Sequence, residues 1–195
     1  MLYRFTSLRR TTEPAALAVS RTTAKAHLRV THSGEDSLID LYIGAAVRHV
    51  EDYTGRALVT QSWTMKLAGF CGDIILPRPP LASLTSFTYL DTDGASQAVS
   101  ASLYTTDTAS EPGAIRLNPD SDWPDTDDGE NTVTVVYSCG YGASETSVPE
   151  AIRQAILLMV GHSYENREAV SVGGAVSVFP LAVDALLAPY RLVQV

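Results

Sequence analysis

The chain has 195 residues, with 14 lysines and arginines, 22 aspartates and glutamates, and a formal net charge of −8. This length is typical of one domain, or of one domain with an insertion, and a hydrophobic content of 45% is enough to build a core. No apolar run approaches the ~20 residues that a transmembrane helix needs. The first residues lack the apolar stretch of a secretory signal, and two cysteines cannot form a disulfide framework. We therefore expect a globular, disulfide-free protein of a reducing cytoplasm, with no membrane partner.

The charge is unevenly distributed along the chain. Residues 1–30 carry six bases and one acid, whereas residues 31–147 carry five bases and 17 acids. An acidic body argues against a protein that wraps nucleic acid, because neutralising phosphates requires clustered lysine and arginine. The short basic segment fits docking to an acidic protein surface and a solvated tail equally well.

Two helices are predicted near the N-terminus. Ser20 is expected to cap a short helix that ends near Arg29. Ser33, with Asp36 three residues later, is expected to open a second helix that ends at Gly55. Apolar residues recur there at helical spacing, and further apolar residues widen the stripe to a second side: Ile39, Ile43, Ala46, Val47 and Val50, then Leu38, Leu41, Tyr42 and Ala45.

The amino-acid composition changes between residues 57 and 147, where Thr, Val, Ser, Tyr, Gly and Pro dominate and the apolar runs are shorter. This pattern predicts about six strands in an antiparallel sheet or small barrel. The predicted strands are Val59–Leu67, Asp73–Leu76, Leu84–Leu90, Leu103–Thr106, Ala114–Leu117 and Thr132–Tyr137.

Helical periodicity returns after the strands. Ser147 and Glu150 have the spacing of a capping box, with Pro149 in the first turn of a helix predicted to run to Arg167. A Gly-rich connector at 171–177 leads to a last short helix, Leu181–Leu187.

These elements predict an α+β fold, with a helical core and an antiparallel β insertion between the two long helices. The expected division is an N-terminal arm (1–19), the first part of the helical core (20–56), the β insertion (57–147), the second part of the core (148–168), and a flexible link with a C-terminal segment (169–195).

No motif in the sequence predicts an active site, a metal site or a cofactor. Cys139 lies in a Ser-Cys-Gly-Tyr-Gly run that differs from a nucleophile elbow, and a buried thiol at a strand end is the better interpretation. The acidic stretch 120–130 lacks the ligand spacing of a calcium loop and is interpreted as a solvated loop.

Several segments, in order along the chain, resemble the phage head–tail connector (adaptor) family. They are Ala24–Val30, Asp36–Arg56, Ser62-Trp63, Val135–Gly142, Val148–Ile152, His162–Glu168 and Pro180–Arg191. The resemblance implies a structural protein, not an enzyme, of tailed phages, prophages or gene transfer agents. It would act at the head–tail junction of the particle, after assembly in the host cytoplasm. Members form a ring, generally dodecameric, beneath the portal; the ring extends the DNA channel without specific DNA binding and receives the stopper protein and then the tail.

The resemblance also suggests where partners bind. The C-terminal segment of the family reaches the portal, so portal-docking residues are expected at Phe179, Pro180, Leu181, Leu186, Leu187, Tyr190 and Arg191. The alternative is that this segment folds back on its own helices. Contacts between subunits are expected at Leu38, Leu41, Tyr42, Arg153 and Arg167.

Three other function classes remain open at this stage. They are another ring-forming tail-completion (terminator) protein, a small hydrolase that uses Cys139 or a metal, and a carbohydrate-binding β module. The last would require Trp123 to be exposed beside other aromatic side chains.

Overall fold

The computed structural model describes residues 5–166 and 181–192, and it divides into two compact units. The helical unit comprises residues 16–59 and 142–192 of the chain, and the β unit comprises residues up to 15 together with 60–141. The class is α+β with antiparallel sheets, as predicted. Strands β2 to β8 of the β unit lie between the second and third helices, whereas β1 comes from the segment before the first helix.

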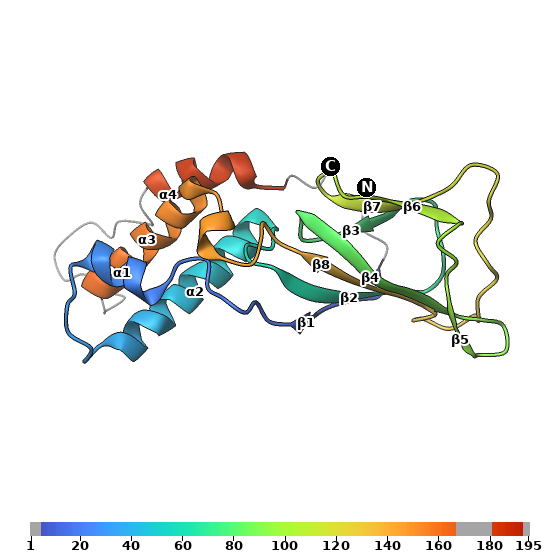
Figure 1. Ribbon diagram of the computed structural model, residues 1–195, viewed down its shortest axis with the longest axis horizontal. Coiled ribbons are helices and arrows are strands. Elements are labelled where there is room, and N and C mark those ends of the chain that lie inside the picture. Colours follow the sequence, from blue (N-terminus) through green and yellow to red (C-terminus); the bar gives the residue numbers. More distant parts are fainter. Residues whose placement is uncertain (1–4, 167–180, 193–195) are drawn as a thin grey trace. The chain divides into compact units, whose positions relative to one another are not determined.

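The helical unit is built on two long helices, α2 (Asp36–Thr54) and α3 (Glu150–Glu165), which pack against each other (Figure 1). Helix α1 (Arg21–Leu28) contacts both of them, and α4 (Leu181–Leu187) packs on α3. Short 3-10 turns precede α3 (Glu145–Ser147) and follow α4 (Ala188–Tyr190). The predicted apolar stripe supplies the core, with Ile39, Ile43, Ala46 and Val50 of α2 facing Ile152, Ala155, Ile156, Met159 and Val160 of α3 in one buried set.

The helix ends follow the sequence signals in two places and depart from them in two others. Ser20 caps α1 by accepting a hydrogen bond from the Thr23 amide, and Gly55 ends α2 in the left-handed conformation, as predicted. The capping role predicted for Ser33 is wrong, because Glu35 is the N-cap residue and α2 begins at Asp36. Ser147 likewise does not cap α3, since it lies in the preceding 3-10 turn.

The β unit contains a five-stranded and a three-stranded antiparallel sheet, not one sheet or a closed barrel. The larger sheet has the order β1-β2-β8-β4-β5 and the smaller has the order β3-β7-β6 (Figure 1). Their bounds are β1 Ser7–Thr12, β2 Gln61–Leu67, β3 Ile74–Leu76, β4 Leu81–Leu90, β5 Ser96–Ala98, β6 Tyr104–Asp107, β7 Gly113–Leu117 and β8 Val133–Cys139. Strands β1 and β5 were not predicted. They form the two edges of the larger sheet, so residues 7–12 are part of a sheet and not of a free arm.

One face of the larger sheet forms the core of the β unit together with the smaller sheet. Alternate residues of β2 and β8 are buried, as the two-residue period of a strand requires: Met65, Leu67, Val133, Val135, Tyr137 and Cys139. Phe87 on β4 meets Tyr104 on β6 edge to face at 5.2 Å between ring centroids. The Tyr137 hydroxyl donates to the Pro77 carbonyl oxygen at 3.0 Å, which satisfies its polar end inside this core.

Candidate interaction surfaces

The outer side of α2 leaves apolar and small residues in solvent. Leu41 is 65% exposed, and Gly44 has nothing within 4 Å of the position that a Cβ would occupy. Ala45 is exposed, and Leu38 and Tyr42 are half-buried. An exposed leucine beside the small residues Gly44 and Ala45 can pack closely against a partner, because the contact would bury apolar surface with little steric hindrance.

Ion pairs hold the start of α2 against α1. Lys25 Nζ lies 2.6 Å from Asp36, and the Arg21 guanidinium pairs with Asp40 and reaches Asp36 at 3.4 Å. The hydrogen bond from Arg21 lowers the pKa of the Asp40 carboxyl, and Asp40 in turn raises the pKa of Arg21. These pairs fix the position of α1 and leave the outer side of α2 to the residues named above.

The C-terminal helix lies partly inside the helical unit. Val183 and Leu187 are 2% and 1% exposed, whereas Leu186 is half-buried. Leu187 is therefore a core residue in this structure, which is the fold-back alternative for that side chain. Of the other residues expected to dock on a portal, Phe179, Pro180 and the side chain of Leu181 lie outside what the structure describes.

Residues 188–192 are fastened to the C-terminal end of α2. Arg56 Nε donates to the Tyr190 carbonyl oxygen at 2.6 Å, and the Leu192 amide donates to the Thr54 carbonyl oxygen at 3.0 Å. The Arg191 guanidinium carbon lies 5.3 Å from the ring centroid of Tyr53. Tyr190 is half-buried and Arg191 is exposed, so both retain surface that a partner can reach.

The two arginines expected at subunit contacts differ in what the structure says of them. Arg153 is half-buried and already has partners within its own subunit, since its Nε donates to the Val148 carbonyl oxygen at 3.2 Å and its guanidinium lies 3.9 Å from Glu150. Arg167 lies outside the described residues. Of the four expected contact residues that the structure describes, Leu41 is the one that it leaves most exposed.

The acidic stretch 120–130 forms a loop that an aromatic cluster anchors to the β unit. Trp123 stacks on Phe70 at 4.8 Å between centroids with an interplanar angle of 7°, and it meets Phe87 edge to face at 5.8 Å. Trp123 is half-buried, and its indole nitrogen is buried. Its ring is thus occupied in packing, which argues against the exposed aromatic platform of a carbohydrate-binding module.

Six carboxylates of this loop point into solvent: Asp120, Asp122, Asp125, Asp127, Asp128 and Glu130. Within the described ranges, no group of three or more His, Cys, Asp and Glu side chains gathers as a metal ion requires. Cys139 is 0% exposed on the inner face of β8, where substrate cannot reach its sulfur. No helix in the described part of the chain has the length and apolarity to span a membrane.

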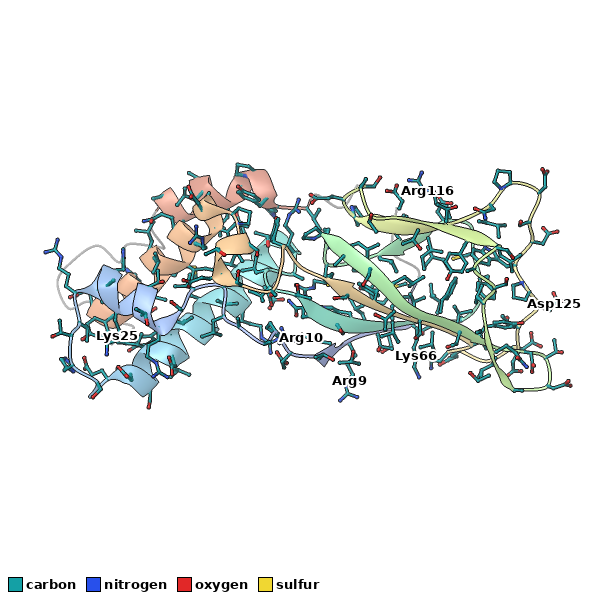
Figure 2. All side chains as sticks on the ribbon, viewed as in Figure 1. Arg9, Arg10, Lys25, Lys66, Arg116 and Asp125 are labelled. Carbon is teal, nitrogen blue, oxygen red and sulfur yellow. The ribbon has the colours of Figure 1, made fainter. Side chains whose placement is uncertain are left out.

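The exposed face of the larger sheet was not predicted as a surface of interest. Because β1 was missed, Arg9 was placed in an N-terminal arm for which docking to an acidic surface and a solvated tail both remained open, whereas it stands on an edge strand and points away from the sheet (Figure 2). Register places Arg9 beside Thr64 and Ser7 beside Lys66. The alternation of polar and apolar residues in β2 and β8 could have indicated this face, because such alternation is typical of a sheet with one side in solvent.

Comparison with known proteins finds one matching sequence family and several similar solved structures. The sequence model of the phage gp6-like head–tail connector protein family matches residues 22–77. The neck of an empty gene transfer agent (GTA) particle, computed with C6 symmetry, contains a chain of 25% identity that covers 97% of both chains with a TM-score of 0.80.

Two further solved structures agree with this. A chain in the virion of a native GTA particle has 25% identity, 96% coverage of both chains and a TM-score of 0.80. A chain in the neck of a native GTA particle, computed with C12 symmetry, has 25% identity, 97% coverage of both chains and a TM-score of 0.72. No curated protein sequence matches the chain.

These findings confirm the resemblance to head–tail connectors that the sequence suggested. The family match covers α1, α2, β2 and β3, and the structural similarity extends over nearly the whole chain. The similar proteins are structural parts of particle necks and not enzymes. The chain is accordingly a structural protein of the virion-neck type, and the hydrolase alternative is set aside.

Proposed function

We propose that this chain is the head–tail connector subunit of a phage-like particle. Copies of it form a ring, a dodecamer in the particle, beneath the portal; the ring extends the DNA channel and receives the stopper protein and the tail. The observation that carries the proposal is a fold similarity over 97% of the chain to neck proteins in structures computed with C6 and C12 symmetry.

Contacts between subunits are assigned to the outer side of α2. Leu41 is the most exposed large hydrophobic residue described, and Leu38 and Tyr42 border it on the same helix. A ring subunit needs an apolar patch beyond its own core, because each copy must bury surface on its neighbours. Arg153 and Arg167 are kept as secondary contacts at the same interface.

Contact with the portal is assigned to the exposed side of the C-terminal segment. Leu186, Tyr190 and Arg191 retain accessible surface, whereas Leu187 serves the core of the subunit. The ties from Arg56 and Thr54 to this segment present it in a fixed conformation, which lowers the entropy cost of binding a partner. Phe179, Pro180 and Leu181 are proposed to extend the same contact.

An excess of acid suits a subunit of a DNA channel. Residues 31–147 carry 12 more acids than bases. A basic lumen would bind the phosphates and slow the passage of DNA, whereas an acidic or neutral one repels them. DNA is therefore proposed to pass through the ring without specific contacts.

The test is to delete the gene for this chain in a strain that produces the particles. We expect filled heads without tails in electron micrographs, and restoration of tailed particles by the wild-type gene. Tailed particles at normal yield in the deletion strain would refute the proposal.

The portal contact can be tested separately with two matched variants of α4. Leu186→Glu places a charge on the half-buried side assigned to the portal, whereas Ala185→Glu places it on an exposed position that points in another direction from the same helix. We expect tailless heads with Leu186→Glu and normal particles with Ala185→Glu, while circular dichroism shows both subunits folded. Equal assembly of both substitution variants would exclude this surface.

A terminator that joins the ring at the tail end is the second candidate, because it also forms rings. Imaging of the neck with a tag on the C-terminus separates the two. The connector proposal requires the tag beside the portal, and the terminator alternative requires it at the junction with the tail.

A further inference from the structure

The solvent-facing side of the five-stranded sheet is polar and, among the described residues, free of acidic side chains. Register and the alternation of strands place the following residues on this open face: Ser7, Arg9, Thr12, Ser62, Thr64, Lys66, Ser83, Ser86, Thr88, Leu90, Ser96, Ala98, Thr134, Val136 and Ser138. Twelve of these fifteen are polar, two are basic and none is acidic. The open face thus differs from the β unit around it, whose described residues include twelve acids and five bases.

The two cations of the open face have no ionic partner among the described residues. Arg9 and Lys66 are both exposed, and no ion pair involves either of them within the part of the chain that the structure describes. Figure 2 shows Arg9 and Lys66 on the edge formed by β1 and β2, and Asp125 on the loop at another end of the unit. Positive charge on this face is therefore available to a second molecule.

The same chain carries a complementary surface. The 120–130 loop holds six exposed carboxylates, and none of them forms an ion pair with a described residue. Stacking of Trp123 on Phe70 fixes the loop on the aromatic core, and the Asp127 amide donates to the Leu90 carbonyl oxygen at 3.1 Å. An anchored loop loses little conformational entropy when it binds, so its charges are prepared for a contact.

We propose that the open face of one copy receives the 120–130 loop of a second copy, with Arg9 and Lys66 pairing with the loop carboxylates. The two surfaces differ from each other, so the contact is head-to-tail, and repetition of such a contact closes a ring when the rotation fits. The inference deepens the proposed function, on which it rests, by naming a lateral contact in the β units. Hydroxyl groups of the open face can donate hydrogen bonds to carboxylates that the two cations do not reach.

Such a contact is expected to be weak as an isolated pair and sensitive to salt. Exposed ion pairs contribute little one at a time, and salt screens charges over ~8 Å at physiological ionic strength. Repetition around a ring adds the weak contacts together, because each subunit is then held on two sides.

Zero-length carbodiimide crosslinking tests the contact directly, since it joins an amine to a carboxylate only where the two touch. The chain has two lysines, Lys25 and Lys66. Lys25 already lies 2.6 Å from Asp36 within one subunit and provides an internal positive control. Purified full-length protein at high concentration, and isolated particles, would be prepared as a mixture of isotopically light and heavy chains and mapped by mass spectrometry.

We expect mixed light–heavy peptide pairs that join Lys66 to a carboxylate of residues 120–130, with a yield that falls several-fold in high salt. The triple variant Asp125→Asn, Asp127→Asn, Asp128→Asn should lower the yield several-fold. Arg116→Glu is the matched control, because it changes charge on the smaller sheet, where Arg116 pairs with Asp73 and Asp107. It should leave the yield unchanged.

Three outcomes would overturn the inference. One is the absence of light–heavy Lys66 pairs in both preparations while the Lys25–Asp36 link forms. A second is a Lys66 link to carboxylates outside the loop. A third is binding of duplex DNA by the purified protein that the variant Arg9→Glu, Lys66→Glu loses, which would show that the open face binds phosphate groups. Tailless heads in the deletion strain together with any of these results would leave the proposed function standing and reject this contact alone.

Discussion

Arg56 donates a hydrogen bond from its Nε to the backbone carbonyl oxygen of Tyr190, at 2.6 Å. Arg56 is 8% exposed, so this bond forms largely away from water and joins the end of α2 to a residue far along the chain. Beside it, the Leu192 amide donates to the Thr54 carbonyl oxygen. The C-terminal segment is therefore held by main-chain and charged contacts as well as by the apolar side of α4.

Replacing Arg56 with alanine is expected to loosen residues 188–192. A hydrogen bond from a charged donor contributes about 1.5–3 kcal/mol, and its loss should lower the free energy of unfolding of the helical unit by a similar amount. Urea denaturation gives the energy, and hydrogen exchange of residues 188–192 gives the location. Arg48→Ala, on the exposed side of α2, is the control and should change stability by less than about 0.5 kcal/mol. Unchanged exchange in Arg56→Ala would contradict the assigned role.

Glu145 should make the stability of the helical unit depend on acid pH. Its carboxylate accepts hydrogen bonds from the Ser20 amide and from Thr23 Oγ1, the latter at 3.1 Å. Burial opposes ionisation of this group, but the hydrogen bonds outweigh burial, and the pKa of Glu145 is lowered in the folded protein. A carboxyl with a lowered folded pKa stabilises the protein fully above its unfolded pKa of about 4.3, and this contribution is lost as pH falls through the folded value.

Glu145→Gln is accordingly expected to be less stable than the wild type at neutral pH, by about 1–3 kcal/mol for the lost charged hydrogen bonds. The difference should shrink as pH falls from the unfolded pKa through the lowered folded pKa, because the wild-type carboxyl then gains its proton. Urea denaturation at several pH values measures both effects. Glu150→Gln, whose side chain is 95% exposed, serves as the control. A difference that stays constant with pH would show that charge at Glu145 is unimportant.

Leu41→Glu should prevent ring formation without unfolding the subunit. The side chain is 65% exposed, so its replacement should change the free energy of unfolding by less than about 0.5 kcal/mol. In a ring, the same change would bury a charge in an apolar contact, which is costly. Electron microscopy of particles and the melting temperature of the purified subunit check the two halves of this prediction. Thr22→Glu, at an exposed polar position on α1 and away from the outer side of α2, is the control and should leave both readouts unchanged.

Two glycines should respond in opposite directions to alanine. A Cβ at Gly113 would lie 2.7 Å from the side chain of Leu81 and 3.0 Å from the Asp107 carbonyl oxygen, so Gly113→Ala should destabilise the β unit by about 1–3 kcal/mol. Gly44, in the middle of α2, has nothing within 4 Å of that position, and Gly44→Ala should stabilise the helical unit by roughly 0.5–1 kcal/mol. Thermal denaturation of both variants tests the two predictions. A lower melting temperature for Gly44→Ala would show that other atoms of the protein already fill the space beside Gly44.

The sequence predicted the elements whose side chains carry a strong period. Helix α2 follows from Ile39, Ile43 and Val50, and α4 was predicted with the bounds that it has, Leu181–Leu187. Strand β1 was missed because Ser7–Thr12 has no apolar alternation. An edge strand of this kind is stabilised by hydrogen bonds to β2, which its own residues do not reveal.

The start of α3 shows how two local rules compete. Ser147 and Glu150 have capping-box spacing, but Pro149 forces the residue before it out of the helical region. Val148 is extended accordingly, with φ −77° and ψ 134°, and the helix begins only after Pro149. The restriction imposed by proline therefore outweighs the cap.

The candidate surfaces were predictable only in part. An amphipathic pattern identifies the apolar side of a helix but not what covers it. Leu187 and Leu41 were equally plausible contact residues in the sequence, yet one is 1% exposed and the other 65%. Leu187 is buried because α4 packs against α3, and packing between segments that are distant in the chain cannot be read from either segment alone.

The pairing of Gln61 with Cys139 has a consequence for how this protein can vary. The insertion leaves the helical unit on β2 and returns on β8, so its two ends are neighbouring strands, about 5 Å apart. The two ends of the insertion are therefore as close together as the ends of a hairpin loop. The entropy cost of closing such a loop grows only slowly with the number of residues in it. Evolution can lengthen, shorten or exchange this module by recombination while the scaffold that carries it keeps its geometry.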